Sequence, residues 1–338
     1  MIRVLRIAGR IALALAGLIV IAYLVWSAGP ARVGETLWEA RAWLPLIAAL
    51  ECAPIASDYF TLRVLLGRDA QEVPAATWLR SSTLAYAMMI CLPAGRAAGE
   101  VTRASLLARH LGAARAASAS TRLQVAYVFA IGVLAAIEAA TAALRFGIRA
   151  PLALLLAGTS VLMMAFAGAL FSALRDARFR RWVDRIRRLV TRSETAPTAA
   201  GPEAPRNVPL RAVLICCASR TAQALQYGII LVAVGGVASV HGALIAHGIE
   251  IVGSTLGEFL PNQIGVVDTT YRTFALDVGF ASVPARALSI ALLARLARLL
   301  VAATCITVAA ASRRAADAES PPDGETARPS GARRVPIA

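Results

Sequence analysis

The chain has 338 residues, of which 58% are hydrophobic, and it carries a net charge of +15. Soluble domains are only about 45–50% apolar, so this composition indicates a polytopic α-helical membrane protein. All of the positive charge comes from arginine, because the sequence contains no lysine, and this excludes P-loop nucleotide binding and Schiff-base chemistry, which both need a lysine amine.

The first apolar run, residues 11–26, follows Arg3, Arg6 and Arg10. A positively charged start before an apolar run is also found in signal peptides. The length of this run and the bulky Trp26 favour a retained first helix instead. Positive charge in front of the helix places the N-terminus in the cytoplasm.

Further apolar runs approach the length of about 20 residues that crosses a bilayer. We expect spans at residues 43–62, 78–93, 124–144, 151–173, 210–236 and 286–311, with a broken apolar region at 243–282 before the last span. These runs predict an all-α bundle in the membrane.

A strongly basic segment, RDARFRRWVDRIRRLVTR at residues 175–192, has eight arginines against two aspartates. Apolar residues recur at helical spacing between the arginines, which predicts an amphipathic helix along the inner membrane surface. The simpler interpretation is a cytoplasmic topology marker, and the alternative is recognition of an anionic lipid. A nucleic-acid partner is not expected, because loop arginines in so apolar a chain serve these roles.

The segment SETAPTAAGPEAPRNVP, residues 193–209, predicts a flexible linker because it is rich in Pro, Ala and Thr. It separates a first membrane half, residues 1–192, from a second half, residues 210–312. The polar, Pro-rich tail at residues 313–338 is expected to be disordered. We expect a multi-pass protein of the cell (inner) membrane with both termini and the 175–192 loop in the cytoplasm.

This topology contains a conflict in the first half. A cytoplasmic N-terminus followed by five simple crossings places residues 175–192 outside, whereas their charge places them inside. One segment is therefore not a simple crossing, and the region around Pro93 is the best candidate, because charged residues follow the proline directly.

Two interrupted segments match each other across the halves. LPAGRAAGEVTR starts at Leu92 and LPNQIGVVDTTYR starts at Leu260, 168 residues later. In each, a carboxylate follows the proline by seven residues, and an arginine comes just beyond it. The carboxylates are Glu100 and Asp268, and the arginines are Arg103 and Arg272.

Proline and glycine break helices and free backbone groups, which hydrocarbon cannot satisfy. Matching breaks in corresponding halves therefore point to a transporter site at the end of discontinuous helices. We predict two re-entrant broken-helix segments, related as an inverted repeat. The alternative is two ordinary loops with a chance similarity.

The last span contains Arg295 and Arg298, three residues apart and so on one helical face. A charged residue at the centre of a membrane helix costs about 2.5–3.5 kcal/mol on insertion scales, and such residues face a bundle interior or a wet cavity. Their candidate partners are Glu100, Asp268 and Glu258. A purely structural ion pair and snorkelling to the surface are the alternatives.

Other polar residues carry weaker signals. His247 and Glu250 form a single HxxE pair, which is more typical of helix packing than of a metal site. Glu51, Asp58, Glu138 and Arg220 are secondary candidates for polar contacts inside the bundle. The five cysteines form no paired CxxC pattern, so no metal or other cofactor is expected.

The segment LPAGRAAGEVTRASLLARHLG, which starts at Leu92, resembles the Leu-Pro-x-x-x-x-Gly-Glu-x-x-Arg motif of the lysylphosphatidylglycerol synthase transmembrane region, or flippase-like domain family. LPNQIGVVDTTYRTFALDVG, with the arginines of ALLARLARLL, resembles its second motif. The resemblance extends over residues 10–311. It implies about eight spans, re-entrant segments and movement of polar lipids between leaflets, and some relatives are associated with hopanoid lipids.

The sequence departs from the family pattern at several positions. Asp268 stands where the family usually has glutamate. Arg122 is kept, but Thr121 and Ala126 stand where acidic residues are common. Nothing in the sequence resembles the aminoacyl-tRNA-using domain of the larger relatives, so an aminoacyltransferase is not expected.

We therefore expect a protein that translocates or binds an anionic or isoprenoid lipid, with one half rocking on the other. The expected substrate-binding residues are Arg96, Glu100, Arg103, Asp268, Arg272, Arg295 and Arg298. A membrane-embedded enzyme that modifies lipid headgroups and a scaffold for lipid-biosynthesis proteins are the alternatives.

Overall fold

The structure is a computed structural model of the chain. It describes residue 19 and the ranges 22–92, 95–175, 207–258, 263–280 and 283–319. Several predictions fall outside these residues: most of the first span, Pro93 and Pro261, the amphipathic segment from 176 to 192, the linker up to 206, and the tail beyond 319.

Every element in the described ranges is helical, which confirms the all-α prediction. The long helices are α5 (Ala75–Cys91), α6 (Gly95–Leu111), α7 (Ala113–Phe146), α8 (Pro151–Arg175), α10 (Leu210–Ala233), α11 (Val240–Leu256) and α13 (Pro284–Glu319). The shorter ones are α2 (Pro30–Ala40), η1 (Arg41–Trp43), α3 (Leu44–Glu51), α4 (Ala53–Leu66), η2 (Gly67–Glu72) and α12 (Val266–Thr273). Within these ranges, α7, α8 and residues Ala285–Ser312 of α13 are long and apolar enough to cross a membrane.

The predicted span at 43–62 consists of two helices, α3 and α4, which meet at Cys52. Pro45 and Pro54 lie in the first turn of each helix. Proline is tolerated there because the first-turn N–H has no intrahelical partner in any case. At the other end of the chain, α13 continues to Glu319, so the helix extends beyond the predicted boundary at 312.

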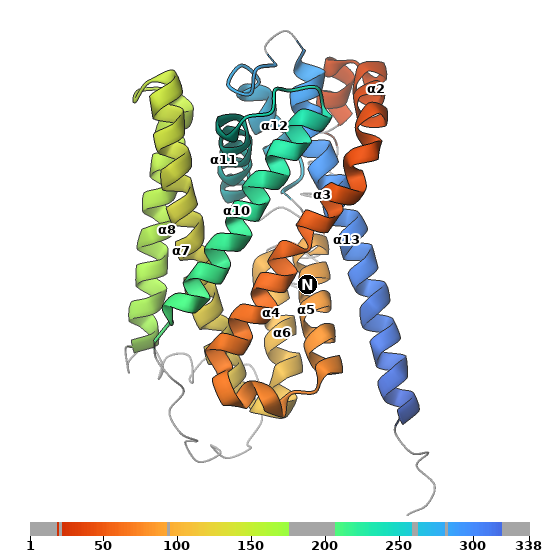
Figure 1. The fold of residues 1–338 in the computed structure, drawn as a ribbon, viewed down its shortest axis with the longest axis vertical. Helices are drawn as coiled ribbons and strands as arrows, with labels where there is room; N and C mark the ends of the chain where they lie inside the picture. Colours follow the sequence, from red (N-terminus) through yellow and green to blue (C-terminus); the bar gives the residue numbers. More distant parts are fainter. Residues whose placement is uncertain are drawn as a thin grey trace, which may run out of the picture.

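The α5–α6 pair is a hairpin rather than a simple crossing. Each helix has 17 residues, or about 25 Å at the rise of an α-helix, which is shorter than a bilayer core of about 30 Å. Figure 1 shows both helices side by side in the lower half of the bundle, so α6 returns to the end where α5 begins. A hairpin in place of one crossing agrees with the prediction that the region around Pro93 is not a simple crossing.

The α5–α6 contact depends on glycine. A Cβ on Gly99 would lie 2.7 Å from the carbonyl oxygen of Ala85, and one on Gly95 would overlap the carbonyl of Met89. Because backbone atoms cannot move aside as a flexible side chain does, only glycine allows the helices to approach this closely.

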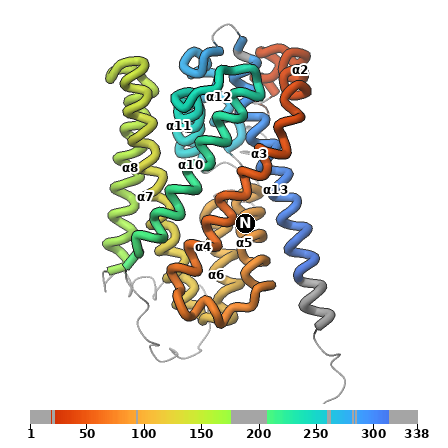
Figure 2. Tube along the Cα trace, viewed as in Figure 1, coloured from red at the N-terminus to blue at the C-terminus, as the bar shows by residue number. Residues whose placement is uncertain are grey.

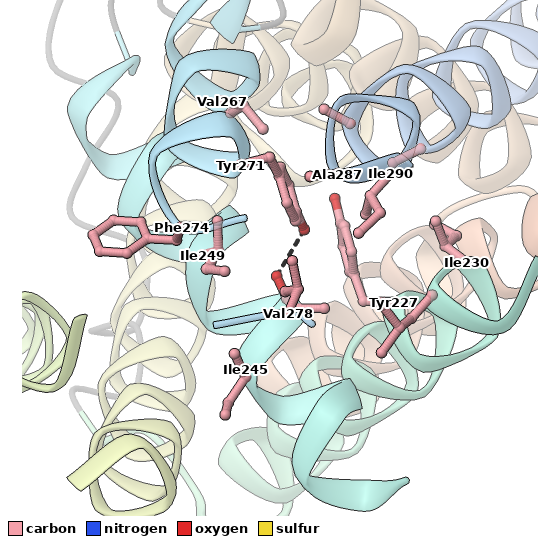
Figure 3. Packing of buried hydrophobic residues seen from close by; sticks show 14 of the residues in the cluster. Tyr227, Ile230, Ile245, Ile249, Val267, Tyr271, Phe274, Val278, Ala287 and Ile290 are labelled. Carbon is pink, nitrogen blue, oxygen red and sulfur yellow. Dashed lines mark hydrogen bonds between the residues drawn. The ribbon is translucent and has the colours of Figure 1, made fainter. Parts of the chain in front are cut away.

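A second pair, α11 and α12, lies in the upper half of the bundle (Figure 1). The Tyr271 hydroxyl on α12 donates a hydrogen bond of 2.7 Å to the carbonyl oxygen of Ala246 on α11. Figure 3 shows this bond within the apolar cluster that also holds Tyr227 of α10. The rings of Tyr227 and Tyr271 stack with centroids 6.4 Å apart, so α10, α11 and α12 share one core.

The two halves predicted on either side of the linker pack into one bundle. Helix α10 lies against α4 and α7 (Figure 2), and the Ser57 hydroxyl donates to the carbonyl oxygen of Ile215 at 3.4 Å. The α7–α8 hairpin forms one side of the bundle, and only 22% of the most apolar stretch of α8 is buried. The exposed apolar face of α8 is therefore suited to contact lipid.

Replacing Gly99 with alanine is expected to destabilise the α5–α6 hairpin. The added methyl group would press on the Ala85 carbonyl, and overpacking of this kind costs about 1–3 kcal/mol. Thermal unfolding of the purified protein in detergent would measure the effect. The control is Gly158→Ala on α8, where a Cβ meets nothing within 4 Å, and which should leave the melting temperature unchanged or raise it. Equal melting temperatures for the two variants would contradict the close-approach argument.

Candidate functional site

The α5–α6 hairpin and the α11–α12 pair, which also forms a hairpin, meet at one cavity of about 630 Å³, which is lined by residues of α5, α6 and α11. The start of α6 contributes Arg96, and the end of α11 contributes Ser254. The charged side chains in its wall are Arg96, Arg220 and Arg298 together with Glu51, Glu100, Glu250 and Glu258. Charge from both halves of the chain therefore converges on a single space.

Apolar side chains form another part of the wall. Those from the α7–α8 hairpin are Val128, Ile131, Met163, Phe166 and Leu170. The cavity is therefore amphipathic, and part of its apolar lining belongs to α8, whose other side is largely exposed.

The first charged cluster joins α4 to α6. Arg103 donates to Asp58 Oδ2 at 2.6 Å and to Glu100 Oε1 at 2.5 Å. Arg96 lies farther from Asp58, with its Nη2 atom 3.7 Å from Oδ1. Arg103 is thus neutralised by two close carboxylates, whereas Arg96 makes only a long ion pair.

Arg96 also contacts α7. Its Nε donates to Gln124 Oε1 at 3.3 Å, and its Cζ lies 3.4 Å from the centre of the Tyr127 ring. Arg220 of α10 lies against the same ring, with its Cζ at 4.1 Å. The face of an aromatic ring carries partial negative charge, so Tyr127 stabilises two guanidinium groups from different helices.

The second cluster surrounds Arg298 of α13. Its Nη2 donates to Glu250 Oε1 at 2.5 Å and to the Tyr227 hydroxyl at 2.8 Å, and its Nε lies 3.9 Å from Glu51 Oε1. Glu51 also accepts hydrogen bonds from the Tyr86 hydroxyl at 2.8 Å and from Gln226 Nε2 at 2.9 Å. These contacts connect α3, α5, α10, α11 and α13 through one arginine and its carboxylates.

A third ion pair lies outside the cavity wall. Arg295 of α13 donates two hydrogen bonds, at 2.9 and 2.8 Å, to the two oxygens of Asp268 on α12. Asp268 is fully buried, and the backbone N–H of Gly265 donates to it at 2.9 Å. Gly265 has a φ of 84°, a conformation that suits glycine. This bidentate pair fastens α12 to α13.

Glu138 of α7 and His247 of α11 form a buried contact, with Nδ1 and Oε1 2.6 Å apart. His247 also belongs to the cavity wall. Its neighbour in the HxxE pattern, Glu250, binds Arg298 instead. The two side chains thus have separate partners, and the described residues contain no group of three or more His, Cys, Asp or Glu side chains placed to hold a metal ion.

The structure brings most of the predicted site residues together but not all of them. Arg96, Glu100 and Arg298 line the cavity, and Arg103 binds Glu100 beside it. Arg295 pairs with the predicted partner Asp268 away from the cavity wall. The predicted residue Arg272 lies elsewhere.

Arg272 is exposed on α12 and donates to the Ser27 hydroxyl at 2.7 Å. Asp268 already accepts bonds from Arg295 and Gly265, and the other buried positions of α12 are Val267, Thr270 and Tyr271. Arg272, the counterpart of Arg103 in the second segment, therefore binds Ser27 and not Asp268.

Some site residues had only weak sequence signals. Glu51, Asp58, Glu138 and Arg220 were secondary candidates as charges within apolar runs, and all four are buried in polar contacts of the bundle. Arg298 pairs with Glu250 and Glu51, and neither was among the partners predicted for it. Tyr127 and Gln124 were missed, because neither residue type is unusual in a membrane helix.

A family model described as the Lysylphosphatidylglycerol synthase TM region matches residues 10–305. The match covers most of the 338 residues, so the chain belongs to this family, and the resemblance carried by the two Leu-Pro segments is confirmed. No curated protein matches the chain. The family and the three long apolar helices agree on a membrane-embedded protein.

The Asp268–Arg295 pair is expected to be coupled energetically. Arg295→Gln leaves the buried carboxylate of Asp268 unneutralised, and breaking a buried pair in this way costs about 3–5 kcal/mol. The double variant Asp268→Asn/Arg295→Gln should lose less stability than the two single variants summed. Melting temperatures in detergent would measure all three.

Arg272→Gln is the matched control for this series, because Arg272 is an exposed arginine of the same helix pair. Its melting temperature should correspond to a change within about 0.5 kcal/mol. A double variant that loses the sum of the single losses would contradict the coupling.

Proposed function

We propose that this member of the Lysylphosphatidylglycerol synthase TM family binds the polar headgroup of a membrane lipid in the central cavity and lets the headgroup pass between leaflets. The observation that carries the proposal is that two opposed hairpins end at one amphipathic cavity. A headgroup that crosses a bilayer must exchange water for other polar partners, because unsatisfied polar groups are costly in hydrocarbon. The charged wall offers such partners.

The size and composition of the cavity suit a lipid. Its volume of about 630 Å³ is within the range of about 300–1,000 Å³ typical of small-molecule sites. The charged wall would hold the headgroup, while the wall formed by Phe166 and Leu170 of α8 would contact the start of the tails. The remaining tail would stay in the membrane beside the exposed face of α8.

The opposed hairpins suggest how access alternates. The α5–α6 hairpin lies toward one end of the bundle and the α11–α12 hairpin toward the other (Figure 1), and residues of α5, α6 and α11 line the cavity. Rocking of one half on the other would then open the cavity to one side at a time. The two cavity arginines without a close carboxylate, Arg96 and Arg220, favour an anionic lipid, including an isoprenoid phosphate, as the cargo.

We further propose that the end of the bundle holding the α4–α5 turn faces the cytoplasm of a bacterial-type cell membrane. Helix α8 ends there and leads into residues 175–192, and the start of α10 and the end of α13 lie at the same end (Figure 1). The eight arginines of that segment place it inside by the positive-inside rule.

This orientation predicts the labelling of introduced cysteines. Arg68→Cys lies in η2 at the proposed cytoplasmic end, and Ile148→Cys lies in the exposed turn between α7 and α8 at the other end. A membrane-impermeant maleimide added to intact cells should label Ile148→Cys alone, and both variants after lysis. The unsubstituted chain, with its five native cysteines, gives the background. The reverse pattern in intact cells would overturn the orientation.

Lipid passage is tested by reconstituting the full chain in vesicles that contain fluorescent phospholipids or polyprenyl phosphates. Quenching from outside reports the fraction of lipid that reaches the outer leaflet. Ser254 lines the cavity, so Ser254→Trp places an indole ring in it. This variant should slow lipid exchange by at least about tenfold, or about 1.4 kcal/mol in the barrier. The matched control is Val161→Trp on the exposed face of α8, which should exchange lipid at the rate of the unsubstituted protein.

Two results would refute the proposed function. One is exchange of every tested lipid at the rate of protein-free vesicles. The other is equal exchange by Ser254→Trp and the unsubstituted protein, because a blocked cavity cannot be the route of passage.

A further inference from the structure

The arginines of the site differ in how far their charge is neutralised. Arg103, Arg295 and Arg298 each form ion pairs with N–O distances of 2.5 to 2.8 Å. Arg220 has no ion pair with any carboxylate of the described ranges, and Arg96 has only the 3.7 Å contact to Asp58. The positive charge of the cavity is therefore least compensated where α6, α7 and α10 meet.

We propose that this corner of the cavity, formed by Arg96, Arg220, Tyr127, Gln124 and Ser120, is a binding subsite for a phosphate group. The proposal rests on the proposed function, in that the phosphate is assigned to the lipid headgroup held by the cavity. It goes further by stating which arginines bind the cargo and which serve to hold the helices together.

Unpartnered hydrogen-bonding atoms support this assignment. Arg96 Nη2, Arg220 Nε, Gln124 Nε2 and Ser120 Oγ are buried and have no hydrogen-bond partner, and all four side chains line the cavity. Arg220 is only 8% exposed and Ser120 only 5%. Buried donors without partners are unfavourable and rare in native proteins. A ligand with several acceptor oxygens would satisfy them together.

The Tyr127 ring helps two like charges remain neighbours, although the carboxylate paired with Arg96, that of Asp58, lies 3.7 Å away. Both Cζ atoms lie within 4.1 Å of its centre, so the ring stabilises both cations through its π face. A carboxylate in the same place would accept their hydrogen bonds and neutralise them. A guanidinium over a ring keeps the in-plane N–H donors that bind phosphate oxygens in pairs.

The neighbouring acceptors fit the rest of a headgroup. Glu100 Oε2 is buried without a partner, and Glu258 also belongs to the cavity wall. Carboxylates repel a second anion and accept hydrogen bonds from hydroxyl groups. The phosphate is therefore expected at the Arg96–Arg220 corner, with its hydroxyl-bearing substituent toward the carboxylates.

Binding of matched short-chain probes to the purified full chain in detergent tests the subsite. Dihexanoyl phosphatidic acid and dihexanoylglycerol differ only by the phosphate, and inorganic phosphate alone represents the free anion. Calorimetry should detect tighter binding of phosphatidic acid than of dihexanoylglycerol. Arg220→Gln should weaken phosphatidic acid by about tenfold to a hundredfold, as expected for lost charge-assisted hydrogen bonds. Arg145→Gln, an exposed arginine of α7 outside this cavity, should leave the affinity unchanged.

A second pair of variants covers the case in which Arg220→Gln does not fold. Tyr127→Phe keeps the ring and should bind phosphatidic acid as the unsubstituted protein does, whereas Tyr127→Leu removes the ring and should bind it at least about tenfold more weakly. Equal affinity of Tyr127→Leu and Tyr127→Phe would contradict the role of the ring.

The remaining outcomes separate the ligand sources and the two proposals. Equal binding of phosphatidic acid and dihexanoylglycerol, or an unchanged affinity in Arg220→Gln, would overturn the phosphate subsite while leaving lipid passage intact. Binding of inorganic phosphate as tightly as phosphatidic acid would overturn the assignment to a lipid headgroup. Normal phosphate-dependent binding with no lipid exchange in vesicles would overturn the proposed function and keep the subsite.

Discussion

The structure depends on the pairing of buried charges between helices. Asp58–Arg103 joins α4 to α6, Glu250–Arg298 joins α11 to α13, and Asp268–Arg295 joins α12 to α13. An isolated ion in a medium of low dielectric is costly, whereas a well-bonded pair is tolerated. Each pair therefore requires its two helices to keep their relative positions. The short hairpins, which lack the length to span the membrane alone, are held in the bundle at these points.

The hairpins explain how so many charges reach the interior. An unbroken apolar helix satisfies its own backbone and has little tolerance for charge. Helix α6, by contrast, begins within the bundle and carries Arg96, Glu100 and Arg103 in its first three turns. Close approach of α5 and α6 at Gly95 and Gly99 encloses these side chains. The interruption, the glycines and the charges are thus parts of one arrangement.

Much of this arrangement could be predicted from sequence, because it is local. Apolar runs predict helices, and a Leu-Pro-Ala-Gly break followed by Glu100 and Arg103 predicts a turn that carries charge. The partners of Arg298 could not be predicted in this way, because Glu51 lies 247 residues away and reaches it only through the packing of α3 against α13. The same limit hid the convergence of Tyr127 with Arg220. Sequence symmetry also misled at Arg272, since burial of one face of the short α12 decides which side chains point inward.

The unequal pairing of the arginines connects stability to function. A fully neutralised arginine such as Arg295 has no charge left for a ligand, and its release would loosen the helices that it joins. A weakly neutralised arginine such as Arg220 contacts α7 through the Tyr127 ring, but no carboxylate of the described ranges forms an ion pair that offsets the cost of burying its charge. Natural proteins tolerate such local violations mainly where function requires them. A cavity that must hold an anion and then release it needs both kinds of arginine, because a rigid frame keeps the weakly paired charges in place while the ligand provides the close counter-charge that they lack.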